Sequence, residues 1–287
     1  MTATIIQRKS GRAILAAALA LSMSACSTPE AVQQFTASAK DAAAQLPPLV
    51  RDMTASCIRK QLADRSPGEI ADRDALAADS CKELAAQEPN VLNALTILTA
   101  YLNSLNQLAS NKTVSFDEEI DGLAGKIQSA GKFGAPQVNA VQGLAKFLAD
   151  AAASGFQRKK LGDALKRADG DIATLMTALE TIIGSDYDRL LRTEEESVLS
   201  RYRDVVAPEK SLATQLLIQD RWRTDLAAIK AKQAAAKDAQ SALMKISSGH
   251  HALAQQVDRW DAAQLYKILN PYASSIQTLV ADFKAAY

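Results

Sequence analysis

The sequence predicts an all-α protein: an elongated antiparallel bundle of long helices with no β-sheet. Alanine is abundant, whereas the 287 residues include only 12 glycines and 8 prolines, so helix propensity is high and tight turns are few. Apolar residues recur at three- and four-residue spacing over long stretches, which is typical of helices that bury one face. Aromatic residues make up only 5% of the chain, which disfavours a protein built of many short strands.

The first 25 residues have the layout of an export signal. Arg8, Lys9 and Arg12 form a basic start, and residues 13–21 form an unbroken apolar run. A run of this length suits a signal sequence but is too short to span the hydrocarbon of a bilayer. We therefore expect residues 1–25 to be a signal peptide that is removed on export.

The end of this segment, Met23-Ser24-Ala25-Cys26, resembles the lipobox of bacterial lipoproteins, with methionine in place of the usual leucine. The resemblance implies that Cys26 becomes the first residue of the mature chain and carries a diacylglyceryl thioether and an acylated amine, a firm membrane anchor. The residue after Cys26 is Ser27 and not an aspartate. By the same resemblance, this implies that the protein is transferred to the outer membrane, where it would lie on the periplasmic face or at the cell surface. The alternative is an ordinary signal peptide with Cys26 incidental, which Met23 at the −3 position disfavours.

The charge of the mature chain does not favour binding to nucleic acid. The full sequence holds 33 Lys and Arg residues and 32 Asp and Glu residues. Loss of residues 1–25 removes three basic residues and leaves 30 against 32, a formal charge near −2. This balance offers no basic surface for a phosphate backbone, so we expect no nucleic-acid partner.

Two cysteines remain in the mature chain, Cys57 and Cys81, in a compartment where disulfides form. Each lies on the apolar stripe of its own predicted helix, and the two can meet if these helices form a hairpin that turns near Glu69. Ser66 and Glu69 also match a capping box, which would start the second helix earlier and move the cysteines too far apart. We expect the disulfide, with two buried thiols as the alternative.

The mature chain is divided into two parts. Residues 26–48 are assigned to the lipidated cysteine and a partly helical tether, because large apolar residues are few there and Pro47-Pro48 cannot continue a regular helix. Residues 49–287 are assigned to one helical-bundle domain. Helices are predicted in the first half of this domain over residues 49–62, 71–87, 89–108, 115–129 and 136–148, with a boundary at Glu88-Pro89.

Long helices are predicted in the second half, after a break near Asp169-Gly170. Residues 171–206 and 209–246 should form a long antiparallel hairpin that turns at Pro208. A second turn at Ser247-Ser248-Gly249 leads into the last helix.

Two features of this last helix follow from its position. Pro271 should kink or break it. A fold back about Ser248 also places Trp260 opposite Ala236, where the ring would fill the core and would not stack on a ligand.

No pattern of residues indicates catalysis or metal binding, so we expect no catalytic residue, no cofactor and no metal. His250 and His251 point about 100° apart on a helix and cannot share a metal as an i, i+4 pair can, so we interpret them as polar residues at a helix start. The glutamates at 194–196 are interpreted as a solvated face, and the basic residues at 158–160 as a surface loop and not a lipid-binding patch.

We therefore expect a non-enzymatic interaction, scaffold or regulatory protein of the cell envelope, anchored through Cys26 and bound to another envelope protein. The alternative is a ligand-binding or sensory module with an apolar, aromatic-lined cleft near Trp222, Tyr187 or Tyr266. A third possibility is an enzyme such as a cell-wall hydrolase, whose convergent side chains no sequence spacing reveals.

Overall fold

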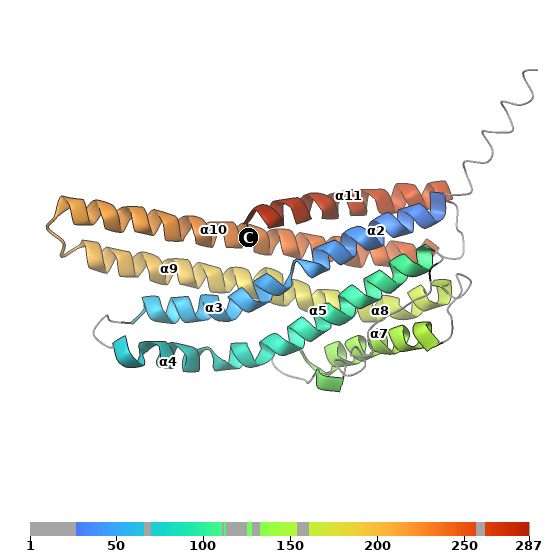
Figure 1. Cartoon of the computed structure of the whole chain (residues 1–287), viewed down its shortest axis with the longest axis horizontal. Coiled ribbons are helices and arrows are strands. Elements are labelled where there is room, and N and C mark those ends of the chain that lie inside the picture. Colours follow the sequence, from blue (N-terminus) through green and yellow to red (C-terminus); the bar gives the residue numbers. More distant parts are fainter. Residues whose placement is uncertain are drawn as a thin grey trace, which may run out of the picture.

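The computed structural model describes residues 27–65, 70–110, 112, 125–127, 133–153, 161–256 and 262–286. These residues form an elongated bundle of α-helices (Figure 1), and no β-strand occurs among them. The predicted all-α class is confirmed. No helix in this part of the chain is long and apolar enough to cross a membrane. The predicted features that lie outside the described residues are the signal peptide at residues 1–25, Cys26, the turn near Glu69, the helix start at Ser115, the basic run at 158–160 and Trp260.

The segment predicted to be a tether is instead a packed helix. α2 (Ser27–Ala44) lies against α11 (Ala262–Ala286) and against α5 (Lys82–Ala109). Its inward face is made mostly of small side chains that are almost fully buried: Ala31, Val32, Phe35, Ala39, Ala42 and Ala43. Alanines at helical spacing let neighbouring helices approach closely, so a stripe with little apolar bulk is still buried. The tether assignment is therefore wrong.

Two helices linked by the disulfide follow α2. α3 (Pro47–Ala63) begins at the two prolines, where the missing amide hydrogens would have no helical partner. α4 (Ile70–Ser80) packs beside it. A disulfide joins Cys57 of α3 to Cys81, and their Cα atoms are 6.0 Å apart.

The helix boundaries near this disulfide differ from the prediction. The helix expected over residues 71–87 is interrupted at Cys81, where α4 ends and α5 begins. α5 then continues through Pro89, where a boundary was expected. A proline inside a helix costs about 3 kcal/mol. The buried stripe beyond Pro89 outweighs this cost, because side chains from Val91 to Leu108 along it are almost fully buried.

The next part of the chain is α7 (Ala135–Ala153), then α8 (Leu161–Leu179), the π-helical segment η2 (Glu180–Asp186) and α9 (Tyr187–Val206). The break predicted near Asp169-Gly170 is wrong, because α8 runs through it. Buried side chains continue at helical spacing on both sides of Gly170: Leu165, Ala168, Ile172, Leu175 and Leu179. Their packing outweighs the cost of about 1 kcal/mol that a glycine carries inside a helix.

The longest helix, α10 (Leu212–Gln256), runs through the turn predicted at Ser247-Ser248-Gly249. Gly249 serves close packing here, because an added Cβ would lie 2.3 Å from Cε2 of Phe35 in α2. The prediction that Trp260 faces Ala236 assumed a turn at Ser248, so it loses its basis. Pro271 lies inside α11 without ending that helix.

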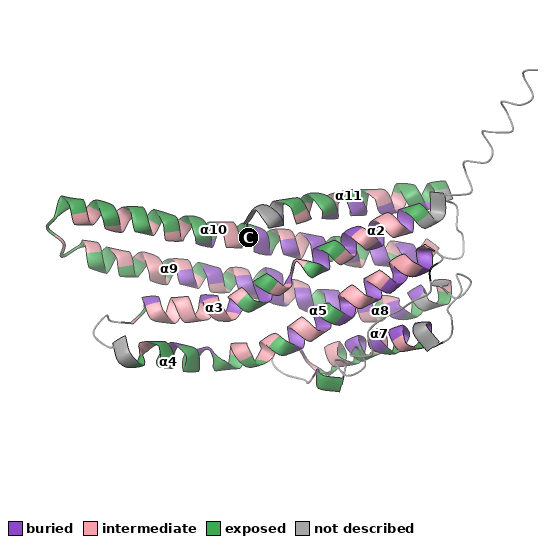
Figure 2. Cartoon of the chain, in the orientation of Figure 1, coloured by how far each residue is buried: buried purple, intermediate pink, exposed green. Residues whose placement is uncertain are grey.

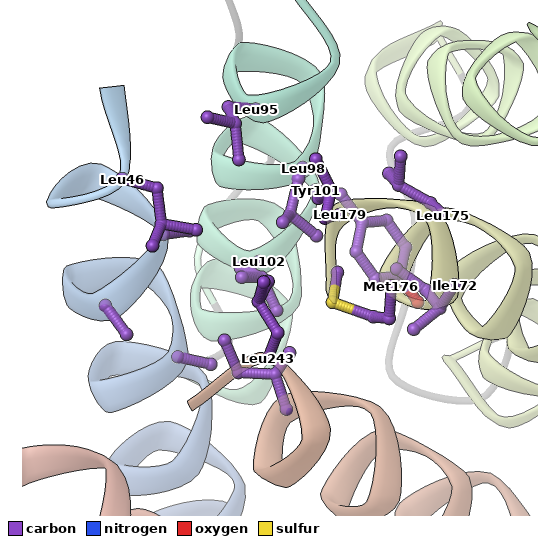
Figure 3. Close-up of a cluster of buried hydrophobic side chains, with 14 of the residues drawn as sticks. Leu46, Leu95, Leu98, Tyr101, Leu102, Ile172, Leu175, Met176, Leu179 and Leu243 are labelled. Carbon is purple, nitrogen blue, oxygen red and sulfur yellow. The ribbon is translucent and has the colours of Figure 1, made fainter. Parts of the chain in front are cut away.

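The core lies where α2, α5, α8 and α10 meet. Figure 3 shows side chains from these helices and from the α2–α3 junction directed toward one another: Leu46, Leu95, Leu98, Tyr101, Leu102, Ile172, Leu175, Met176, Leu179 and Leu243. Each of them is at most 2% exposed. Burial of so many large apolar side chains, each contributing about 1.5–3 kcal/mol, is the main force that holds the bundle together.

The predicted long hairpin is present and extends beyond the other helices. α9 ends at Val206 and α10 begins at Leu212, so the turn lies at Pro208 as expected. Figure 1 shows the end of this hairpin projecting past α3 and α4, while the start of α2 lies at the opposite end of the molecule. There, the Gln33 amide donates to the carbonyl oxygen of Ala109 at 3.0 Å. Figure 2 shows that buried residues are concentrated away from the projecting end.

Candidate functional site

The projecting end of the α9–α10 hairpin, residues 199–222, is called the tip below. Seven large apolar side chains are exposed among the described residues, and four of them lie here: Val205, Leu212, Leu216 and Leu217. Leu212 and Leu217 are 70% and 71% exposed. Single exposed leucines are common, but several in one place mark an interaction surface more often than a passive one.

An apolar hollow of about 440 Å³ lies between the two helices of the tip. Tyr202 and Trp222 are among its walls, together with Leu199, Val206 and Ile218. The Tyr202 hydroxyl donates to Oδ2 of Asp225 at 2.7 Å. Burial and this hydrogen bond raise the pKa of Tyr202, which keeps the phenol protonated. Trp222 was named from the sequence as a possible cleft residue, and it does line a hollow.

Polar contacts between α9 and α10 stiffen the hairpin behind the tip. Lys230 Nζ lies 2.7 Å from Oε2 of Glu195, and the Gln233 amide donates to the same oxygen at 3.0 Å. The hydrogen bond from Lys230, opposed by burial, lowers the pKa of Glu195. Together with the Tyr202–Asp225 hydrogen bond, these contacts join α9 and α10 at several positions along the hairpin. The tip is therefore supported by two helices that are held together by hydrogen bonds and an ion pair.

The base of the hairpin is fixed to α3 by an ion cluster that includes Glu194. The residues at 194–196 were interpreted as solvated, but Glu194 is only 2% exposed, so that interpretation is wrong for it. Its carboxylate accepts hydrogen bonds from Ser56 Oγ at 2.6 Å and from the Arg59 guanidinium. Burial alone would lower the pKa of Arg59, but the hydrogen bonds to Glu194 and Asp52 raise it. Arg59 therefore stays charged against its partners.

Asp52 extends this cluster from α3 to both helices of the hairpin. Its carboxylate accepts from Arg59 at 3.0 Å, from Tyr187 Oη of α9 at 2.6 Å and from Lys232 Nζ of α10 at 2.8 Å. Burial would raise the pKa of Asp52, but these three hydrogen bonds hold it below the ordinary value. Because donors from three helices share one carboxylate, the cluster ties both helices of the hairpin to α3.

A second polar cluster joins α5, α8 and α10 inside the bundle. His250 is fully buried within α10 and not at a helix start as predicted. Its Nε2 lies 2.7 Å from the hydroxyl of Tyr101, and its Nδ1 lies 3.0 Å from Oδ1 of Asp169. His251 reaches the other oxygen of Asp169 at 2.7 Å. The two histidines thus share a carboxylate, which satisfies polar atoms that burial would otherwise leave unpaired.

The chemistry available to this cluster is limited by burial. Burial and the nearby charges of Asp169 and Asp171 raise the pKa of Tyr101 well above its ordinary value, so its hydroxyl is poorly suited to act as a nucleophile. Within the described part of the chain, no group of three or more His, Cys, Asp or Glu side chains could hold a metal ion.

A further cavity of about 470 Å³ lies beside the disulfide, between α3, α5, η2 and α9. The sequence did not predict it. Tyr187 and Tyr266, the other residues named for a cleft, line neither this cavity nor the hollow at the tip. The available sequence signals were Pro89, which can distort a helix, and the predicted pair of cysteines, but the walls come from segments far apart in the chain.

No family model matches this sequence, and no curated protein or solved structure matches the chain.

Proposed function

We propose that this protein is a lipid-anchored interaction protein of the bacterial envelope that uses the tip to bind an apolar helix of another envelope protein. The observation that carries the proposal is the concentration of apolar surface at the end of a hairpin that projects beyond the bundle: exposed apolar side chains, and an apolar hollow that other residues of the tip line. No catalytic role is part of the proposal.

The shape of the tip favours a helical partner. Two antiparallel helices form a groove, and a third amphipathic helix can complete it by placing apolar residues at i, i+3 and i+4 into the groove. Leu212 and Leu216 are four residues apart and so lie on one face of α10. Tyr202 and Trp222 offer large, rigid apolar surfaces of the kind that dominate binding energy at protein interfaces.

The position of the proposed anchor supports the same function. Cys26 precedes Ser27, the first residue of α2, and consecutive Cα atoms are about 3.8 Å apart. Because α2 is packed in the bundle, a lipid on Cys26 would hold one end of the molecule close to the membrane. α10 has 45 residues and is about 68 Å long at roughly 1.5 Å per residue. The tip would then be presented far from the anchored membrane surface.

Site-specific photo-crosslinking in the native bacterium tests the proposal. A photoreactive amino acid replaces Leu217 at the tip or, as a matched control, Met244, which is exposed on the same helix within the bundle. We expect one partner to be captured from position 217 and not from 244. Leu212→Ser with Leu216→Ser should abolish the capture without changing the amount of protein, and the captured peptide should come from an amphipathic helix.

Equal capture from both positions, or no capture from position 217, would mean that the tip is not the surface that binds the partner. The same experiment with Cys26→Ala separates the anchor from the tip. If mass spectrometry of the purified wild-type protein finds no lipid on Cys26, the lipid anchor is wrong, whereas capture from position 217 still reports on the tip.

A further inference from the structure

Three departures from regular α-helix surround the cavity beside the disulfide. The backbone is interrupted at Cys81 between α4 and α5, Pro89 lies inside α5, and η2 on the opposite wall is π-helical. Proline and π segments are common causes of helix distortion, and π segments occur often at functional sites. Each of these irregular segments contributes residues to the cavity wall, among them Cys81, Glu88 and Ile182.

The inner walls of this cavity are apolar and mostly buried. Val50 and Met53 of α3, Val91 of α5, Phe133 and Ile182 are each less than 9% exposed and line it. The disulfide links the α3 wall to the beginning of α5, so it limits separation of these two walls. A preformed apolar cavity of this kind, with a volume within the range of about 300–1,000 Å³ found for small-molecule sites, suits a small apolar group.

The rim of the cavity carries an excess of negative charge. Glu83, Glu88 and Asp186 contribute three carboxylates, and among the described residues of the lining Arg189 is the one cation. Arg189 is paired with Asp186 at 2.6 Å, so the two glutamates on the α5 side have no cation beside them among these described lining residues. Thr54 Oγ1 donates to Glu88 Oε2 at 3.1 Å. A carboxylate accepts about four hydrogen bonds, so this contact leaves capacity for a donor from a ligand.

We propose that this cavity binds a small amphiphilic cation, with its apolar body between α3 and Phe133 and its ammonium group beside Glu83 and Glu88. An anionic headgroup would meet like charge at this rim, and a neutral one would gain less from the carboxylates. No residue of the tip lines the cavity, so this inference does not depend on the proposed function.

Three probes with the same eight-carbon chain test the inference: octylammonium, 1-octanol and octanoate. Binding is measured by isothermal titration calorimetry on the full chain carrying Cys26→Ala, purified without detergent so that none enters the cavity. We expect saturable binding of octylammonium, with 1-octanol at least about tenfold weaker, as the loss of a charge-assisted hydrogen bond implies. Octanoate should bind more weakly still.

Two substitutions locate the binding. Leu84→Trp should fill the cavity and abolish binding of octylammonium, whereas Leu76→Trp, on the exposed surface of α4 outside the lining, should leave it unchanged. Glu88→Gln should reduce the preference for octylammonium over 1-octanol. Circular dichroism measures whether each variant is folded. If Leu84→Trp does not fold, the location of the binding site is judged from Glu88→Gln alone.

Equal affinities for octylammonium and 1-octanol, or a preference for octanoate, would overturn the assignment of a cation. Failure of all three probes to bind would overturn the site itself, as would equal losses from Leu84→Trp and Leu76→Trp.

Discussion

Three consecutive glutamates at 194–196 occupy three different environments. Glu194 is buried against Ser56 and Arg59, Glu195 is half-buried beside Lys230, and Glu196 is exposed. Successive residues on a helix point about 100° apart, so identical neighbours need not share a role. Only Glu194 faces α3, and it therefore carries the contact that fixes the hairpin.

We predict that Glu194→Ala lowers the free energy of unfolding by about 2–4 kcal/mol, because it leaves Ser56 and part of the Arg59 guanidinium without their buried partner. The matched control Glu196→Ala should change the free energy by less than about 0.5 kcal/mol, as expected for an exposed site. Urea unfolding followed by circular dichroism measures both. Similar losses in the two variants would mean that the ion cluster does not stabilise the base of the hairpin.

Acid should destabilise the protein through carboxylates whose pKa values are lowered by their partners. In Asp169 the hydrogen bonds from His250 and His251, opposed by burial, lower the pKa below its ordinary 3.8. In Asp52 the burial that would raise the pKa is outweighed by hydrogen bonds from Arg59, Lys232 and Tyr187. The unfolded chain then takes up protons first as the pH falls, so stability present above about pH 4 is lost below it.

Asp171 provides a control of opposite sign, because burial raises its pKa. A raised pKa means that the folded protein takes up this proton first, so stability is gained as the pH falls through that pKa. We predict that Asp169→Asn makes the acid loss of stability shallower and that Asp171→Asn makes it steeper. Urea midpoints measured between about pH 5 and pH 3 test both signs, and equal slopes in the two variants would contradict the assignment.

At the scale of the element, Gly170 inside α8 and Gly249 inside α10 serve different purposes. A Cβ added at Gly249 would overlap the buried ring of Phe35, whereas one added at Gly170 meets nothing within 4 Å. Gly249 is therefore needed for the contact between α2 and α10, and Gly170 only weakens α8. The sequence pattern made both look like helix ends.

We predict opposite effects for the two alanine substitutions. Gly249→Ala should lower stability by about 1–2 kcal/mol, since overpacking of about 1–3 kcal/mol exceeds the gain in helix propensity. Gly170→Ala should raise it by about 0.5–1 kcal/mol. Thermal unfolding of the two variants beside the parent protein gives the comparison, and stabilisation by Gly249→Ala would mean that the Phe35 ring has space to move away.

At the scale of the whole molecule, the absence of a tether changes the expected geometry at the membrane. α2 is packed from Ala31 onward, and the chain near Lys112 lies at the same end, since Gln33 bonds to Ala109 and Lys112 bonds to Gln107. The tip, which contains Lys210, lies at the other end. Under the proposed lipidation of Cys26, the bundle itself sets the distance between membrane and tip.

We predict that a fluorophore on Lys112→Cys transfers energy strongly to acceptor-labelled lipids in vesicles that carry the lipidated protein. The same fluorophore on Lys210→Cys should transfer energy only weakly. The native cysteines at 57 and 81 are bonded to each other and will not take up the label. Equal transfer from both positions would mean that the long axis lies along the membrane, and the tip would then not be presented away from it.

Local patterns in the sequence determined the helical class and several of its boundaries. The three-and-four spacing of apolar residues along α5, and the prolines at 47 and 208, act on the backbone within one or two turns. They indicate a helix, a helix start or a turn at these positions, whereas Pro89 and Pro271 lie inside helices because tertiary packing outweighs their cost. The pairing of Cys57 with Cys81 had a different basis, because these are the two cysteines left in the predicted mature chain, and it depended on a turn near Glu69 that brings their helices together.

Only the tertiary structure decided which weak or polar faces are buried. The alanines of α2, the carboxylate of Glu194 and the ring of His250 are buried because another helix supplies a matching surface or hydrogen bond. Periodicity identifies the apolar side of a helix but not what packs against it, and the free energy of burying a small or polar side chain depends on that partner. The cavity beside the disulfide has the same origin, because its walls come from segments more than 100 residues apart in the chain.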